Sequence, residues 1–209
     1  MAIDASDFLP ERLDLESLRE AACGCRGCDL WEPATQTVFG EGPQDAQMVL
    51  VGEVPGDRED REGHPFVGPA GRELDKALHE VGIDRGEVYI TNAVKHFKFE
   101  ERGKRRIHQR PDAKQVKACR PWLRAELEAV HPEVLVVLGA TAAKSLLGSS
   151  FRLMAERGRP LESDLAPVVF ATIHPSAILR GSDQASRQAQ RELFTEDLRL
   201  AAEAAAHAR

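Results

Sequence analysis

Four short apolar runs constrain the fold of this chain more than any other feature of its sequence. Each is rich in β-branched residues, lacks a regular apolar–polar alternation and is bounded by Gly, Pro or Asp; the runs are 48–52, 88–92, 134–139 and 168–173. This pattern is typical of strands that are covered on both faces, as in a parallel sheet. The sequence therefore predicts a buried sheet with one strand for each run.

Helical patterns lie between and after these runs, and in the first of them Leu74, Leu78 and Val81 share one stripe. The helices that we expect are 71–81, 112–130, 141–147 and 184–207. Strands that alternate with helices predict an α/β fold. A chain of 209 residues suits one domain over 1–209, with a central parallel sheet of about four strands and helices on both faces.

Ligands of such sheets bind beyond the carboxyl ends of the strands. Glu53, Asn92 and His174 follow or end three of the predicted strands. A carboxylate held there can position water or a developing cation, and an amide can both donate to and accept from a base edge. The segments that we expect to form the site are 53–60, 92–110 and 174–180.

Composition and the N-terminus indicate a protein without a membrane span. Hydrophobic residues make up 42% of the chain and charged residues 30%, and no apolar run approaches the roughly 20 residues that a span needs. Residues 1–7 lack the basic and apolar regions of a secretory signal. A cytoplasmic location follows as an expectation, with cysteines that are reduced or bound to metal.

The charge is distributed unevenly along the chain. The net charge is −6, yet the segment 95–120 holds ten Lys and Arg residues against three Asp and Glu residues. A basic segment on an acidic body is what a local phosphate-binding surface needs. A solvated loop is the alternative, and charge by itself does not separate the two.

The four cysteines point to a metal site. Cys25 and Cys28 form a Cys-x-x-Cys pair, and Cys119 lies far along the chain. This spacing suits a soft metal better than a disulfide in a reducing compartment. Zinc is one chemical alternative and an iron–sulfur cluster is the other.

Two glycines around a proline follow the first predicted strand, in Gly-Glu-Val-Pro-Gly at 52–56. Such a turn lets a ligand approach the backbone closely. Phe66 lies in a loop between this turn and a second glycine-rich stretch, where its ring can stack on a flat ligand. A phenylalanine of the apolar core is the alternative reading of Phe66.

These motifs together resemble the uracil-DNA glycosylase superfamily, in particular its iron–sulfur branch of families 4 and 5 and the UdgX type. The residues that carry the resemblance are the turn at 52–56, Pro-Phe-Val-Gly-x-Ala-Gly at 65–71, the strand-end Asn92 and His-Pro-Ser at 174–176. It covers residues from about 23 to 200. The resemblance implies an enzyme that excises uracil from single- or double-stranded DNA, and we expect it to act as a monomer.

The resemblance also implies a [4Fe–4S] cluster. Cys25, Cys28 and Cys119 match ligands of the family, and His96 stands where family 4 has its remaining cysteine. Sequences of the UdgX type share this histidine. Cys23 is a competing ligand, although the single residue between it and Cys25 makes joint ligation awkward. The expected role of the cluster is structural.

The segment Lys-Arg-Arg-Ile-His at 104–108 matches the loop that marks the UdgX type. The resemblance implies that His108 attacks the sugar carbon C1′ after uracil departs and remains bonded to it. A basic surface loop with an incidental histidine is the alternative. The UdgX turn usually reads Gly-Glu-Gln-Pro-Gly, whereas Val54 occupies the Gln position here, so an amide contact near uracil or the loop is lost.

The remaining roles follow from the same resemblance. The catalytic residues are His108, Glu53, which activates or orients the nucleophile, and His174, which stabilises departing uracil at O2. The residues that bind or support the substrate are Gly52, Val54, Asp57, Asp60, Phe66, Asn92, Lys95, Arg106 and Arg180. Among them Phe66 stacks on uracil and Asn92 hydrogen-bonds its amide edge. Ile178 or Leu179 fills the gap that the extruded base leaves.

Two other functions remain open on the sequence. One is an ordinary multiple-turnover glycosylase of the family 4 kind, with water as the nucleophile. The other is a non-catalytic iron–sulfur protein that binds nucleic acid, which accounts for the cysteines and the basic segment. That second function leaves Glu53, Asn92 and His174 at three strand ends unexplained.

Overall fold

A central parallel sheet organises the structure, a computed structural model that describes residues 3–207. Its strands, in the spatial order β2-β1-β5-β6, are β1 (Met48–Gly52), β2 (Tyr89–Asn92), β5 (Val134–Leu138) and β6 (Val168–Thr172), and all three pairings are parallel. The predicted sheet is confirmed, with each strand within a residue of its expected bounds. All four carboxyl ends therefore lie at the same edge.

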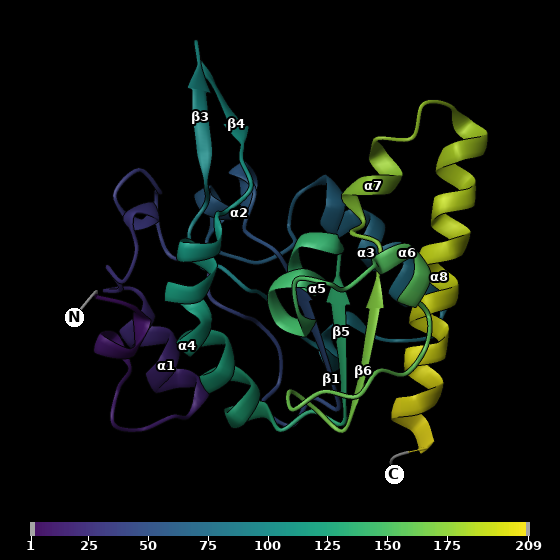
Figure 1. Cartoon of the computed structure of the whole chain (residues 1–209), viewed down its shortest axis with the longest axis horizontal. Coiled ribbons are helices and arrows are strands. Elements are labelled where there is room, and N and C mark those ends of the chain that lie inside the picture. The colour runs from purple at the N-terminus through teal and green to yellow at the C-terminus, as the bar shows by residue number, and fades with distance from the viewer. Residues whose placement is uncertain (1–2, 208–209) are drawn as a thin grey trace.

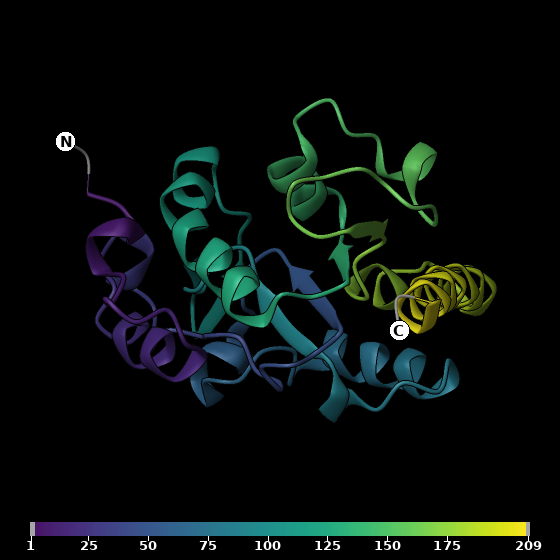
Figure 2. The ribbon, with the colours of Figure 1, turned by 90° about the horizontal axis from the view of Figure 1, so that it is seen from below.

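Helices cover both faces of the sheet, as predicted (Figures 1 and 2). On one face lie α3 (Pro69–Glu80) and α8 (Gln184–His207); on the other lie α4 (Ala113–Val130) and α5 (Ala140–Leu147). Asp112 caps α4, because its side chain accepts the amides of Lys114 and Gln115 while Gln115 reaches back to the Asp112 amide. α1 (Leu15–Ala22) packs against α4 on its outer side.

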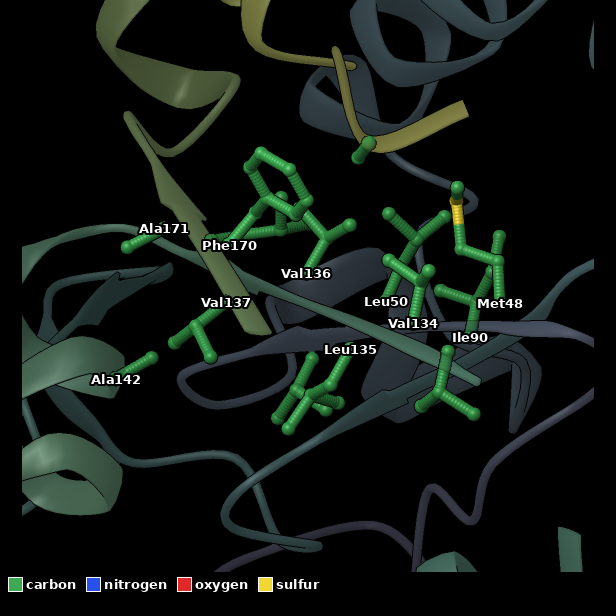
Figure 3. Packing of buried hydrophobic residues seen from close by; sticks show 14 of the residues in the cluster. Met48, Leu50, Ile90, Val134, Leu135, Val136, Val137, Ala142, Phe170 and Ala171 are labelled. Carbon is green, nitrogen blue, oxygen red and sulfur yellow. The ribbon is translucent and has the colours of Figure 1, made fainter. Parts of the chain in front are cut away.

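The main apolar core lies between the sheet and its helices (Figure 3). Leu135, Val136 and Val137 of β5 are fully buried, and their side chains alternate between the two faces among residues of the neighbouring strands. Because β5 is a central strand, it has no polar face. This packing fixes the strand ends in place and so provides a rigid base for the loops above them.

A second apolar cluster surrounds Trp122 of α4. It joins the N-terminal segment to the body and contains Cys25 and Cys119 together with Val54; its other buried members are Ala5, Leu18, Ala22, Leu30, Phe39, Val94 and Ala125. The first of these, Ala5, lies in the short helix η1 (Ala5–Phe8). The predicted metal ligands are thus held inside a packed unit of the fold.

The middle of the basic segment forms a hairpin over residues 99–108, which was not predicted from the sequence. β3 (Phe99–Arg102) and β4 (Arg105–His108) pair antiparallel, with Gly103 at a φ of 63° in the turn. The hairpin projects beyond the sheet edge that carries the strand ends (Figure 1). Because side chains alternate along a strand, Arg106 and His108 share one of its faces.

Short helices complete the chain. α2 (Asp57–Glu62) follows the turn after β1, α6 (Leu153–Glu156) follows α5, and α7 (Ser176–Leu179) follows β6; η2 (Asp29–Trp31) and η3 (Arg85–Glu87) are single turns. In residues 3–207 no helix combines the length and the apolarity that a membrane crossing requires. The expectation that the chain has no secretory signal rests on residues 1–7, of which 1 and 2 lie outside the described residues, as do 208 and 209.

Candidate active site

Three polar side chains lie at the carboxyl edge of the sheet, each at the end of a strand. Glu53 follows β1, Asn92 ends β2 and His174 follows β6. The ring of Phe66 links two of these strand ends. Its centroid lies 5.8 Å from that of His174, and its edge reaches the space above Gly52, beside the Asn92 amide. A ring, an amide and an imidazole are therefore close to the ends of β1, β2 and β6.

Gly52 lies beneath this group because no other residue fits there. A Cβ atom on Gly52 would lie 2.3 Å from Asn92 Oδ1 and 2.7 Å from Phe66 Cζ. Both distances are far below van der Waals contact. The glycine in the predicted turn thus lets the amide and the ring approach the end of β1 directly.

Phe66 has a strained backbone. Its φ is 55°, a left-handed conformation that bulky residues rarely adopt. The loop after it turns so tightly that a Cβ on Gly71 would lie 1.7 Å from the Phe66 carbonyl oxygen. Strain of this kind persists only where the surroundings hold it, and it is often found at functional sites. Phe66 also belongs to the main apolar core, where its ring is 5% exposed, so the alternative of a core phenylalanine stays open.

Hydrogen bonds select one tautomer of His174. The Ser176 amide donates to His174 Nδ1 at 3.1 Å, so this nitrogen carries no proton. The proton of the neutral ring therefore resides on Nε2. Burial lowers the pKa of His174 to about 4, and the nearby Arg180 and His108 lower it in the same direction. His174 is thus a neutral hydrogen-bond donor at physiological pH.

Glu53 is partly removed from water, and this burial raises its pKa above the ordinary value of 4.5. A hydrogen bond from Thr141 and the cations of Arg110 and Arg180 oppose the rise. The oxygen Oε1 of Glu53 is buried and has no hydrogen-bond partner within the described residues. A free acceptor at a strand end is suited to orienting a nucleophile.

His108 lies at the base of the hairpin on β4 and is exposed to solvent. Its ring centroid is 5.9 Å from that of Phe97. Loss of water around the ring lowers the pKa of His108; Glu59 raises it, and Arg110 and Arg180 lower it. The same two arginines act on Glu53 and His108, so the predicted nucleophile and the predicted base share one electrostatic environment.

The structure corrects the expected substrate contacts of Arg106, Asp57 and Asp60. Arg106 Nη1 lies 2.6 Å from Asp60 Oδ2, and its Nε lies 2.5 Å from Asp57 Oδ1. The Arg106 side chain is 13% exposed and that of Asp60 is fully buried. These groups are occupied with one another and fix the hairpin to α2. Support of the loop by Asp57 and Asp60 was expected, and this pairing leaves little of Arg106 and none of the Asp60 side chain open to a phosphate.

The structure also corrects the predicted substrate contacts of Lys95 and Val54. The Lys95 side chain is fully buried and pairs with Glu126, so it has no access to a phosphate. Val54 packs in the apolar cluster around Trp122 instead of lining the space above Gly52. A lysine in a basic segment is exposed by default, and only the partner on α4 explains its burial.

The structure separates the two candidates for the wedge. Ile178 is 1% exposed and belongs to the main core, whereas Leu179 is 41% exposed. Arg180 follows Leu179, is exposed, and donates to the Ser176 hydroxyl at 2.8 Å. Leu179 and Arg180 are therefore the accessible residues of this segment.

The cysteines fit a cluster by their chemistry, although in residues 3–207 no three His, Cys, Asp or Glu side chains are gathered as a metal-binding group. Cys119 Sγ accepts the Lys95 amide at 3.3 Å, and Cys25 Sγ accepts the Trp122 indole N–H at 3.1 Å. Burial raises the pKa of Cys119 to about 12, and charge on Cys28 and Cys25 adds to the rise. N–H donors aimed at buried sulfurs suit metal-bound thiolates.

Both candidates for the fourth ligand lie beside Cys25. A cavity of about 170 Å³ is lined by Cys23, Cys25 and His96 among others. Thr37 Oγ1 donates to the Ala22 carbonyl and so accepts from His96 Nε2, which leaves His96 Nδ1 free. Burial lowers the pKa of His96 to about 4, so the ring is neutral, as a ligand requires.

Comparison with known proteins assigns the family. The sequence profile of the uracil DNA glycosylase superfamily matches residues 39–199. The chain belongs to this superfamily. A type-4 uracil-DNA glycosylase of Sulfurisphaera tokodaii is 35% identical over 175 residues, which are 79% of this chain and 76% of that protein. The corresponding enzyme of Thermotoga maritima is 37% identical over 83% of this chain and 88% of its own length.

A third relative extends the match over most of the chain. The type-4 uracil-DNA glycosylase of Pyrobaculum aerophilum is 33% identical over 195 residues, covering 90% of this chain and 93% of that protein. Within the uracil-DNA glycosylase superfamily, the chain is thus related to the type-4 members. The part of the predicted resemblance that names the superfamily and family 4 is confirmed.

The structure adds residues to this superfamily site that the sequence did not single out. Thr141 and Arg110 both act on Glu53, and Phe97 packs beside His108. Glu59 accepts the Gly68 amide at 2.9 Å and so joins α2 to the loop that carries Phe66. Thr141 follows β5, which is the third strand of the sheet along the chain. No site residue was predicted at the end of this strand. The rule that ligands bind at carboxyl ends applies to that end too.

Proposed function

We propose that this protein excises uracil from DNA and then becomes bonded through His108 to C1′ of the abasic sugar. The observation that carries the proposal is the position of His108 at the base of the hairpin, in the same electrostatic environment as Glu53 and His174. The named activity of the relatives, uracil-DNA glycosylase, supports the first part.

Uracil recognition rests on the group above Gly52. Phe66 stacks on the extruded base, and Asn92 hydrogen-bonds the amide edge that distinguishes uracil from cytosine. Cleavage breaks the bond between C1′ and N1, and the electron pair leaves with uracil as an anion. His174 donates from Nε2 to O2 of that anion. A neutral donor fits this role, and the low pKa of His174 keeps it neutral.

Capture of the sugar rests on His108. A lone pair of the neutral imidazole forms the bond to the cationic C1′, and the proton of the other ring nitrogen passes to solvent. Glu53 stabilises the positive charge on C1′ and orients the ring. The cations of Arg110 and Arg180 favour the unprotonated imidazole. Exposed basic residues of the hairpin, together with Arg180, bind phosphates.

We also propose that Cys25, Cys28 and Cys119 hold a [4Fe–4S] cluster with His96 as the fourth ligand. When bound, the cluster supplies structural stability to the N-terminal segment. The support is the burial of the thiols and the N–H donors directed at two of them. The protein would act as a cytoplasmic monomer on uracil-containing DNA.

A denaturing gel tests the covalent step. Protein mixed with uracil-containing single-stranded DNA should give a species that survives SDS and boiling and that saturates at one DNA per protein. His108→Ala should remove this species, whereas His79→Ala, which changes an exposed histidine of α3, should retain it. Wild-type protein that releases uracil over many cycles without this species would refute the covalent mechanism.

The second candidate function is hydrolysis with water as nucleophile. The buried and unpartnered oxygen Oε1 of Glu53 favours it, because a free carboxylate oxygen can orient a water molecule. The type-4 relatives add support at the level of the family. The same gel, read together with the amount of uracil released per protein, separates this function from covalent capture.

A further inference from the structure

A buried ion pair joins α4 to the segment that ends β2. Lys95 Nζ pairs with Glu126 Oε2, and both side chains are fully buried. The pair is flanked by the ring of Phe39, whose centroid lies 5.5 Å from Lys95 Nζ. No step of the proposed reaction uses either charge. Burying two charges is costly unless further hydrogen bonds satisfy them, so their partners matter.

Glu126 is fully satisfied by groups from other segments. Its Oε1 accepts the Gly40 amide at 3.0 Å, the Tyr89 hydroxyl at 2.9 Å and the Thr91 hydroxyl at 2.9 Å. Tyr89 and Thr91 both belong to β2. The carboxylate of α4 therefore fixes alternate residues of the strand that ends in Asn92.

Lys95 holds the end of the same strand. Its Nζ donates to the Asn92 carbonyl at 2.8 Å and to Thr91 Oγ1 at 2.6 Å. Its own amide donates to Cys119 Sγ at 3.3 Å. One residue thus contacts both the backbone of the uracil-binding asparagine and a predicted cluster ligand.

The strand end is also tied to the turn that carries Glu53. The Ala93 amide donates to the Gly52 carbonyl at 2.9 Å, and the Val94 amide donates to the Glu53 carbonyl at 3.0 Å. A shift of residues 92–95 would therefore move Asn92 and Glu53 together. Since Asn92 Oδ1 already lies in the space directly above Gly52, little displacement can be tolerated.

We infer that Lys95 and Glu126 are positioning residues. From buried positions that the substrate does not contact, they hold Asn92 and Glu53 in place for uracil excision. This inference rests on the proposed glycosylase function. It assigns a role to the buried charges beyond stability, because their hydrogen bonds end on the backbone of the base-binding residue. Replacement of the pair should slow excision without weakening the affinity for DNA.

The test requires both charges to be removed together. A single neutralisation leaves one buried charge without its partner, which endangers folding. The double variant Lys95→Met with Glu126→Gln removes both charges, and its Gln oxygen still accepts from Gly40 and Tyr89. We expect the rate of uracil release in a single turnover to fall at least ten-fold below wild type. Binding to uracil-free DNA should stay within two-fold, and iron content per chain should be unchanged.

A matched control uses a half-buried pair between α3 and α8. Arg191 Nη2 lies 2.8 Å from Glu73 Oε2, and the Glu73 side chain is 7% exposed. Glu73→Gln with Arg191→Met should lower the melting temperature without slowing excision, when both variants are assayed well below their melting temperatures. Excision by the Lys95/Glu126 double variant within two-fold of wild type would overturn the inference.

Thr91→Val tests the same inference if the double variant does not fold. It removes the hydroxyl that bridges the pair and keeps the size of the side chain. We expect excision to slow several-fold with unchanged DNA affinity, and a wild-type rate would overturn the inference. Wild-type protein that releases no uracil would instead refute the proposed glycosylase function, so the two failures are distinguishable.

Discussion

The amide oxygen of Asn92 lies 2.3 Å from the position that a Cβ atom on Gly52 would occupy. This distance forces the end of β1 to be a glycine if Asn92 and Phe66 are to converge above it. The absence of a side chain at the end of β1 thus lets two side chains from other segments lie there together.

Gly52→Ala should therefore abolish excision while leaving the fold intact. The added methyl group must displace Asn92 or Phe66, and misplacement of a positioning group by about 1 Å can cost about 100-fold in rate. Uracil release in a single turnover measures the effect, with circular dichroism as the check on folding. Gly82→Ala is the contrasting variant, because a Cβ there meets nothing within 4 Å. Its positive φ of 76° makes a modest loss of stability the expected result.

Asp60→Asn should loosen the hairpin. It removes the charge that pairs with Arg106 and keeps an oxygen to accept the Thr35 amide, which lies 3.0 Å from Asp60 Oδ1. We expect the free energy of unfolding to fall by about 1.5–3 kcal/mol and the rate of cross-linking to fall about ten-fold. Glu62→Gln breaks the exposed pair with Arg58 on the same helix, whose value is about 0–1 kcal/mol. Equal cross-linking by both variants would show that the Arg106 pairing does not position His108.

The sequence predicted the sheet and its main helices because their patterns are local. The strand 134–138 is apolar throughout, and Asp112, a residue type that favours helix starts, precedes the helix 113–130. The hairpin was missed because its pairing depends on distant residues: Arg106 finds Asp57 and Asp60 more than forty positions earlier. The burial of Lys95 depends in the same way on Glu126, 31 positions later.

Candidate site residues could be predicted where they lie at the carboxyl ends of strands. They could not be predicted where contacts between distant segments bring them to the site. Glu53, Asn92 and His174 follow from the carboxyl ends of the strands. Thr141 and Arg110 contribute through their distance to Glu53, which no sequence spacing reveals. Val54 lies next to Glu53 in the chain but packs in the cluster around Trp122, because successive residues of an extended turn point in different directions.

Cross-linking should have an acid limb, along which its rate falls as the pH is lowered. His108 must be unprotonated to attack, and its pKa is held below 6.5; Glu53 must be ionised, and its pKa is raised above 4.5. Cross-linking should thus fall as either group gains a proton. His174 does not contribute to this limb until about pH 4, where it would become charged.

Arg110→Ala should move this acid limb to higher pH. Arg110 lowers the pKa of His108 and that of Glu53, so both values rise when the cation is removed. The cross-linking rate is measured against pH at saturating DNA, with Arg102→Ala, at the exposed turn of the hairpin, as the control. A limb that moves to lower pH, or stays in place, would contradict the assigned electrostatic role of Arg110.

Purified protein should contain iron and absorb broadly in the visible range. Cys119→Ala should lose both properties and melt at lower temperature, because metal-binding energy contributes to folding. Cys23→Ala should keep the iron, whereas His96→Ala should lose it, if His96 is the fourth ligand. Retention by His96→Ala and loss by Cys23→Ala would assign the ligand to Cys23. Stoichiometric zinc without iron in protein prepared anaerobically would rule out the iron–sulfur cluster.

Leu179→Ala should reduce excision from double-stranded DNA more than from single-stranded DNA. An extruded base leaves a gap in a duplex that an apolar side chain can fill, whereas a single strand has no stacked partner to replace. Leu179 is 41% exposed and free to enter that gap, while Ile178 is 1% exposed in the core. We expect the ratio of double- to single-strand rates to fall about ten-fold, since unstacking costs a few kcal/mol that the wedge partly offsets. Ile178→Val supplies the control: it should lower the melting temperature slightly and leave the ratio unchanged. A ratio unaffected by Leu179→Ala would show that another residue stabilises the flipped state.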